Sequence, residues 1–103
     1  MDDVLLRIKR AVLSGRYAFS EKARLEMERD GLTELDVAEA IISAPAIYKK
    51  IRSTSRERRR RLEYLYIIYG TTFDGLVVYT KGKLSSDAEG DFYYFLLSSK
   101  RAE

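Results

Sequence analysis

Apolar side chains in the first 44 residues recur at the period of an α-helix, and start and stop signals separate three such stretches. The first predicted helix has its apolar residues at Val4, Leu5, Ile8, Ala11 and Val12. Gly15 marks its end. A second helix is expected between the cap residue Ser20 and Gly31. A third follows Thr33, because Asp36 stands at the spacing of a capping box. We therefore expect three helices before any strand.

From residue 46 onward the pattern changes to the alternation of β-strands. The predicted strands are residues 46–53 (AIYKKIRS), 63–70 (EYLYIIYG), 75–82 (GLVVYTKG) and 91–99 (DFYYFLLSS). Asp74-Gly75 is a turn signal, so the second and third strands should form an antiparallel hairpin. Residues 83–90 (KLSSDAEG) are polar and read as a flexible connection. The pattern predicts an α+β fold in which three N-terminal helices pack on one face of a four-stranded antiparallel sheet.

Composition places the chain among ordinary folded proteins. Its 103 residues predict a single domain spanning 1–103, with 46% hydrophobic and 34% charged residues. No apolar run approaches the ~18 residues of a membrane span, and MDDVLLRIKR lacks the features of a secretory signal. We expect a cytoplasmic protein without membrane contact.

The absence of cysteine and histidine limits the available chemistry. It removes thiolate nucleophiles, sulfur ligands for metals and the commonest general base. We expect no metal site and no cofactor. Any catalysis would depend on lysine, arginine, tyrosine or carboxylate side chains.

Positive charge is concentrated in residues 49–61. This segment has eight basic residues and only Glu57 as an acid, a net +7, whereas residues 1–48 and 62–103 are each at −2. Such a concentration indicates a polyanionic partner such as RNA. The candidate nucleic-acid-binding residues are Arg52, Arg56, Arg58, Arg59, Arg60, Arg61 and Lys83. An exposed arginine-rich loop that only keeps the protein soluble explains the run equally well.

The second and third helices, joined across Gly31 to Thr33, also suggest a helix-turn-helix DNA reader. Residues 20–44 have seven acidic and three basic side chains, a net −4. Such a surface repels phosphates, so we favour ordinary helix packing.

Tyrosines occur in every predicted strand, at Tyr48, Tyr64, Tyr66, Tyr69, Tyr79, Tyr93 and Tyr94. Each is more often a packing residue than a site residue, but together they indicate a sheet face rich in tyrosine and lysine. The helices should leave this face partly open. Alternation in 46–53 places Lys49 with Ile47 and Ile51 toward the helices, and Lys50 and Arg52 on the open face.

Two stretches carry a resemblance to known families. FSEKARLEMERDGLTELDVAEAI is similar to the N-terminal helices of the DUF4258 family. IYKK at 47–50 and LYIIYGTTFDGLVVYTKGK at 65–83 resemble the tyrosine-lysine step and closing hairpin of MqsR-type messenger-RNA-cleaving toxins. The matching positions are Lys49, Tyr66 and Lys81. The resemblance implies a RelE-like fold, endoribonuclease activity in which these three residues take part, and an antitoxin partner.

The chain departs from these families in two places. Lys22 stands where DUF4258 proteins usually have a histidine. The toxin chains end near the position of Lys83, whereas this chain adds the tyrosine-rich strand 91–99. An extra strand could cover the open face and turn a site into a core. The resemblance selects Lys49 although alternation turns it inward, a conflict that a β-bulge near the arginines would remove.

Two hypotheses follow. In the first, the protein is a metal-independent endoribonuclease in which Lys49 and Lys81 neutralise the scissile phosphate and Tyr66 assists proton transfer. It requires Tyr66 and Lys81 to lie diagonally on one face, with Lys83 beside them. In the second, the protein is a non-catalytic module that binds nucleic acid or an acidic protein through its arginine-rich loop.

Overall fold

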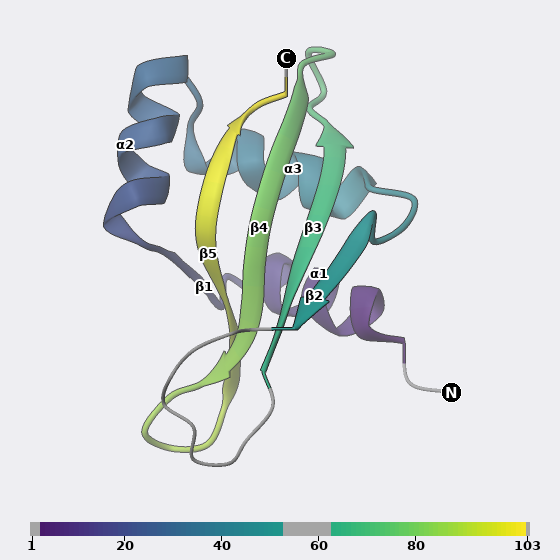
Figure 1. Cartoon of the computed structure of the whole chain (residues 1–103), viewed down its shortest axis with the longest axis vertical. Helices are drawn as coiled ribbons and strands as arrows, with labels where there is room; N and C mark the ends of the chain where they lie inside the picture. Colours follow the sequence, from purple (N-terminus) through teal and green to yellow (C-terminus); the bar gives the residue numbers. More distant parts are fainter. Residues whose placement is uncertain (1–2, 53–62, 103) are drawn as a thin grey trace.

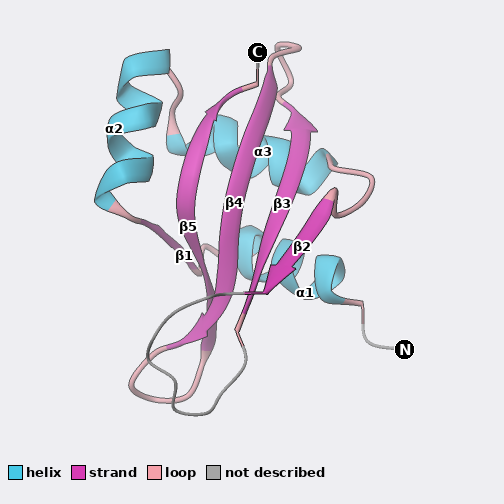
Figure 2. Cartoon of the chain, viewed as in Figure 1, coloured by secondary structure: helices cyan, strands magenta, loops and turns pink. Residues whose placement is uncertain are grey.

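The computed structural model describes residues 3–52 and 63–102. In chain order the elements are α1 (Val4–Leu13), β1 (Tyr17–Phe19), α2 (Glu21–Asp30), α3 (Glu34–Ser43), β2 (Lys49–Arg52), β3 (Tyr64–Thr71), β4 (Val77–Ser86) and β5 (Phe92–Arg101). Figure 1 shows them in space and Figure 2 separates helices from strands. The α+β class predicted from the sequence is confirmed.

The three predicted helices are confirmed, and each begins at a residue whose side chain caps it, Asp3 in the case of α1. Ser20 and Thr33 begin α2 and α3, and their side chains accept hydrogen bonds from the N–H groups of Ala23 and Asp36. The Asp36 carboxylate in turn accepts from the Thr33 N–H at 2.9 Å, which completes the capping box. Gly31 ends α2 at φ 71°, a left-handed conformation that glycine adopts without strain.

The sheet has five strands in the order β1-β5-β4-β3-β2 and is mixed. β1 runs parallel to β5, whereas the other three pairings are antiparallel. The prediction of four antiparallel strands is therefore wrong, and so is the expectation that all helices precede the strands, since β1 lies between α1 and α2. β1 has only three residues, too few to show alternation. Its partner lies at the far end of the chain, so only the folded chain reveals the pairing.

The predicted hairpin is confirmed as β3 and β4. Thr71 pairs with Val77, and Gly75 in the turn has φ 92°, a conformation that favours glycine. Residues 83–86, predicted to be flexible, instead continue β4 and pair with β5. The actual turn is tied by hydrogen bonds between Asp87 and Asp91 and from the Gly90 N–H to the Asp87 carbonyl.

Helices α1 and α3 cover one face of the sheet, and α2 lies along the outer edge of β5 (Figure 1). Ile8, Ile41 and Ile68, which are fully buried, represent these layers in the core. Each contributes about 1.5–3 kcal/mol through burial. The β3–α3 approach is so close that a Cβ added to Gly70 would lie 1.6 Å from the Ala40 carbonyl oxygen. Only glycine fits at this point.

The opposite face of the sheet is not covered by α1 or α3 (Figure 2). The C-terminal strand β5 does not cover it either, because β5 is inserted into the sheet between β1 and β4. We call this surface the open face. Among the described residues, no helix is long and apolar enough to span a bilayer.

Candidate nucleic-acid interface

Strand register determines which side chains reach the open face. Gly70 faces α3, so Ile68 and Tyr66, at two-residue steps along β3, face the helices as well. The intervening residues Tyr69 and Ile67 therefore face the opposite way. Directly paired residues share a face, so the pairing register places each residue of β2, β4 and β5 either on the open face or on the face toward the helices.

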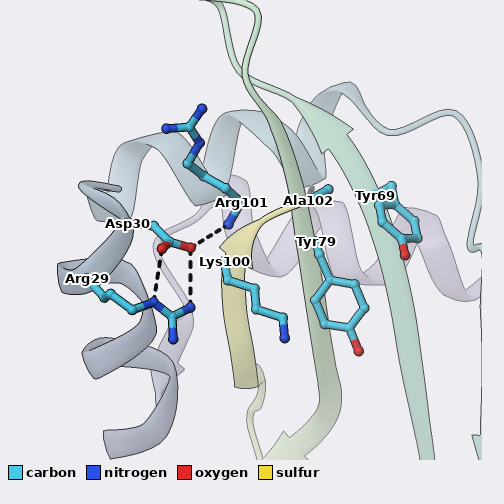
Figure 3. A pocket seen from close by; sticks show the side chains of 7 residues that line it. All are labelled: Arg29, Asp30, Tyr69, Tyr79, Lys100, Arg101 and Ala102. Carbon is cyan, nitrogen blue, oxygen red and sulfur yellow. Dashed lines mark hydrogen bonds and ion pairs between the residues drawn. The ribbon is translucent and has the colours of Figure 1, made fainter.

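A row of tyrosines crosses the open face perpendicular to the strands. The ring of Tyr69 lies 5.5 Å from that of Tyr79 on β4 and 5.1 Å from that of Tyr48, just before β2, both edge-to-face. On β5, the Lys100 ammonium lies 5.4 Å from the Tyr79 ring centroid, a cation–π contact. Tyr48 is 68% exposed and Tyr69 36%. We call Tyr48, Tyr69 and Tyr79 the aromatic row (Figure 3 shows its β3 and β4 members).

A second row runs parallel to the first, two residues further along β3, β4 and β5; at the edge it begins at Lys49, the residue after Tyr48. It consists of Lys49 on β2, Ile67 on β3, Lys81 on β4 and Ser98 on β5, paired in that order. We call it the lysine row. Strand geometry separates the two rows by about 7 Å. Lys49 and Lys81 thus lie on either side of Ile67, next to the aromatic row.

Tyr66 is separated from the two lysines predicted to accompany it. It pairs with Gly82, whereas Lys81 pairs with Ile67, so Tyr66 and Lys81 lie on opposite faces. Tyr66 is 8% exposed and belongs to the core. The expectation that Tyr66 and Lys81 share a face is therefore wrong. A change of one residue in hairpin register reverses every side chain, and the turn signal alone did not specify that register.

The alternation argument for β2 is also reversed. Lys49 and Ile51 pair with Ile67 and Leu65 and lie on the open face. Lys50 and Arg52 pair with Tyr66 and Tyr64 and lie on the other face, where the Lys50 ammonium is 4.4 Å from the Tyr64 ring centroid.

Lys49, which the resemblance selects, therefore lies on the open face, whereas Lys50 and Arg52, which alternation selects, lie on the face toward the helices. Lys49 reaches the open face within regular β2 pairing, without the bulge invoked for it. Arg52, predicted to bind nucleic acid from the open face, is directed away from Lys49 and Lys81.

The other predicted binding residues lie elsewhere. Lys83 is on the open face and forms an ion pair with Glu63 at 3.6 Å. Arg56 and Arg58 to Arg61 lie outside the described residues.

The lysine row ends at β5 in a carboxylate network centred on Glu26 of α2. Glu26 Oε1 accepts hydrogen bonds from Ser98 Oγ (2.7 Å) and the Ser99 N–H (3.0 Å), and Oε2 accepts from Lys22 Nζ (2.9 Å). Burial acts to raise the pKa of Glu26, but these hydrogen bonds outweigh it and hold the pKa below its ordinary value. The carboxylate is therefore charged, and it fastens α2 to the edge of β5.

A pocket of about 830 Å³ lies where the aromatic row meets α2 (Figure 3). We call it the α2–β5 pocket; its polar lining residues are Arg29, Asp30, Tyr69, Tyr79, Lys100 and Arg101. Asp30 accepts hydrogen bonds from Arg29 Nε (3.1 Å) and from the Arg101 N–H (2.9 Å), and the pKa of its carboxyl is lowered by these bonds. Partial burial raises the pKa of Tyr79, so its phenol stays neutral.

Sequence reasoning included Tyr69 and Tyr79 only as members of a general tyrosine cluster and did not identify Lys100, Arg29 or Glu26. The available signal was the i, i+2 spacing of Tyr79 and Lys81, which places both on one face of any strand. Nothing local relates α2 to β5, because that contact joins residues more than 70 positions apart.

Comparison with protein-family models, with curated proteins and with solved structures gave no match. The resemblance to DUF4258 proteins and MqsR-type toxins depends on the quoted sequence stretches alone.

Proposed function

We propose that the protein binds single-stranded RNA across the open face of its sheet. The observation that carries the proposal is the pair of adjacent rows, one of three tyrosine rings of which Tyr48 and Tyr69 are exposed, and one with Lys49 and Lys81. Tyrosine rings stack on unpaired bases, and lysines neutralise phosphates. The rows are only about 7 Å apart, so one ligand can contact both.

The arrangement favours a single strand over a duplex. Bases in a duplex are stacked on one another and cannot lie flat on side chains, whereas unpaired bases can. RNA rather than DNA follows from the resemblance to RNA-cleaving toxins.

Two neighbouring lysines provide a matched test. Lys49 and Lys50 are adjacent, both exposed and on opposite faces of β2, so Lys49→Ala and Lys50→Ala remove the same charge at nearly the same place. Fluorescence anisotropy with a labelled single-stranded RNA should show several-fold weaker binding only for Lys49→Ala. The slope of log affinity against log salt should fall by about 0.7 for that variant. Equal losses in both variants would refute the open face as the binding surface.

Metal-independent RNA cleavage is a second candidate. It is favoured because Lys49 and Lys81 share the open face, and Tyr79, two residues from Lys81 on the same strand, replaces Tyr66 as the tyrosine beside them. The RNA 2′-hydroxyl would attack the scissile phosphate and release its proton to solvent, the two lysines would stabilise charge on the phosphate, and the neutral Tyr79 phenol would donate a proton to the departing 5′-oxygen. An antitoxin with an acidic contact surface is then the proposed protein partner.

Cleavage is tested with RNA in the presence of EDTA. Tyr79→Phe should lower the cleavage rate at least tenfold if its hydroxyl carries a proton, whereas Tyr66→Phe should not. Cleavage that is lost in Tyr66→Phe but retained in Tyr79→Phe would reject this assignment. If the wild-type protein binds RNA without cleaving it, the cleavage candidate is rejected and RNA binding remains as the proposed function.

A further inference from the structure

The α2–β5 pocket differs from the rest of the open face in its charge. Arg29 and Lys100 are cationic and Asp30 is the single carboxylate among its lining residues, which gives a net charge of +1, since Arg101 pairs with Val78 on the other face and its guanidinium points away (Figure 3). Both carboxylate oxygens of Asp30 already accept hydrogen bonds from Arg29 and from the Arg101 backbone. The local excess of positive charge is therefore available to an anion.

The cations are held at one end of the aromatic row. Lys100 pairs directly with Tyr79 in the sheet and contacts its ring. The hydrogen bonds to Asp30 orient the Arg29 guanidinium toward the pocket, and only part of its five N–H donors is used (Figure 3). Arginine and lysine together favour a phosphate group, which accepts several charge-assisted hydrogen bonds. The neutral phenol of Tyr79 adds no repulsion.

The lysine row, in contrast to the aromatic row, does not end at a group of cations where it reaches β5. Beyond Lys81 it reaches Ser98, whose hydroxyl donates to the Glu26 carboxylate. Glu26 is ionised and paired with Lys22, so this position adds no net positive charge. An RNA backbone that follows Lys49 and Lys81 therefore meets a carboxylate at β5. The cations at that edge lie beside the aromatic row.

Helix α2 also closes the open face on this side, since it lies along the outer edge of β5 and lines the pocket (Figure 1). An RNA strand that crosses the sheet from β2 toward β5 therefore ends at Arg29 and Asp30 of α2, which line the pocket. We propose that the α2–β5 pocket binds the terminal phosphate of the RNA strand whose last base lies against Tyr79. This inference rests on the proposed RNA binding and adds that the ligand is a phosphorylated RNA end.

The test uses one short single-stranded RNA, labelled internally, in four forms: without terminal phosphate, with a 5′-phosphate, with a 3′-phosphate and with both. Anisotropy titrations of the wild type should show about tenfold tighter binding for one of the singly phosphorylated forms than for the unphosphorylated RNA. Lys100→Ala should reduce this ratio to about twofold or less, because it removes the ammonium beside Tyr79. The 5′ and 3′ forms together identify which end is bound.

Lys83→Ala is the matched control. It removes the same charge from the same face, but at a position paired with Glu63 and away from the pocket. It should keep the wild-type ratio, and circular dichroism verifies that both variants are folded. Equal binding of all four RNAs would refute the terminal-phosphate inference alone. Binding of none would refute the proposed function, and equal loss of the ratio in both variants would exclude the pocket as its site.

Discussion

Glu26 offers the sharpest test of how the open face is assembled. It is the buried carboxylate that joins α2 to β5, and it is 9% exposed. Its Oε1 accepts hydrogen bonds from Ser98 Oγ and from the Ser99 N–H, a backbone group at the sheet edge beyond the end of β1. Removal of the carboxylate leaves both donors without this acceptor, and α2 loses its attachment beside the pocket.

The magnitude follows from these contacts. An unsatisfied buried donor costs about 1–3 kcal/mol. The Ser98 hydroxyl can rotate to another acceptor, whereas the Ser99 N–H cannot, so we expect Glu26→Ala to lower the free energy of unfolding by about 3 kcal/mol. Glu26→Gln retains an acceptor and loses only charge assistance, at a cost of about 1–2 kcal/mol. Both variants should remain folded if the stability is typical of small domains.

The pH dependence of the free energy of unfolding distinguishes the contribution of the Glu26 charge from that of its hydrogen-bonding geometry. The pKa of Glu26 is lower in the folded state than its ordinary value of 4.5, so its charge contributes stability that is fully present above that pH. The contribution is lost as the pH falls through the folded pKa. Urea unfolding, followed by circular dichroism, should therefore give a difference between wild type and Glu26→Gln that shrinks from about pH 6 to about pH 3. A difference that is constant over this range would refute the ionised network.

Three further predictions concern packing, capping and charge. Gly70→Ala should lower the free energy of unfolding by about 3 kcal/mol or more, because the new methyl overlaps the Ala40 carbonyl; an unchanged melting temperature would contradict the close approach of α3. Thr33→Ala should cost about 1 kcal/mol in urea unfolding through loss of the capping box, and little more when combined with Asp36→Ala; full additivity would argue against a shared motif. Lys81→Ala should lower the salt slope of RNA binding by about 0.7 in anisotropy titrations, and an unaltered slope would remove it from the interface.

Local signals were sufficient for the helices. Ser20, Thr33 and Gly31 specify helix boundaries through hydrogen bonds that span only a few residues, and the structure places α2 and α3 within those boundaries. The hairpin of β3 and β4 was predictable for the same reason, because its turn and its two apolar runs are contiguous.

The membership of the candidate site was less predictable. Lys49 and Lys81 were identified and do share the open face, but Tyr66 faces the core and Tyr79 takes the place beside them. Strand alternation indicates which residues share a face, and it does not indicate which face the helices cover. Which face is covered depends on the packing of α3, whose backbone lies directly against Gly70 of β3.

The α+β class, the three helices and the concentration of cations and tyrosines in the second half of the chain can all be read from the amino-acid order, because each depends on composition or on contacts close in sequence. Tertiary structure alone decided that β1 joins β5 in parallel, that α2 is fastened to β5 by Glu26, and that two rows of side chains meet on one open face. These features depend on pairings between distant residues and on register. A shift of one residue changes the face of a side chain without changing the pattern of the strand that carries it.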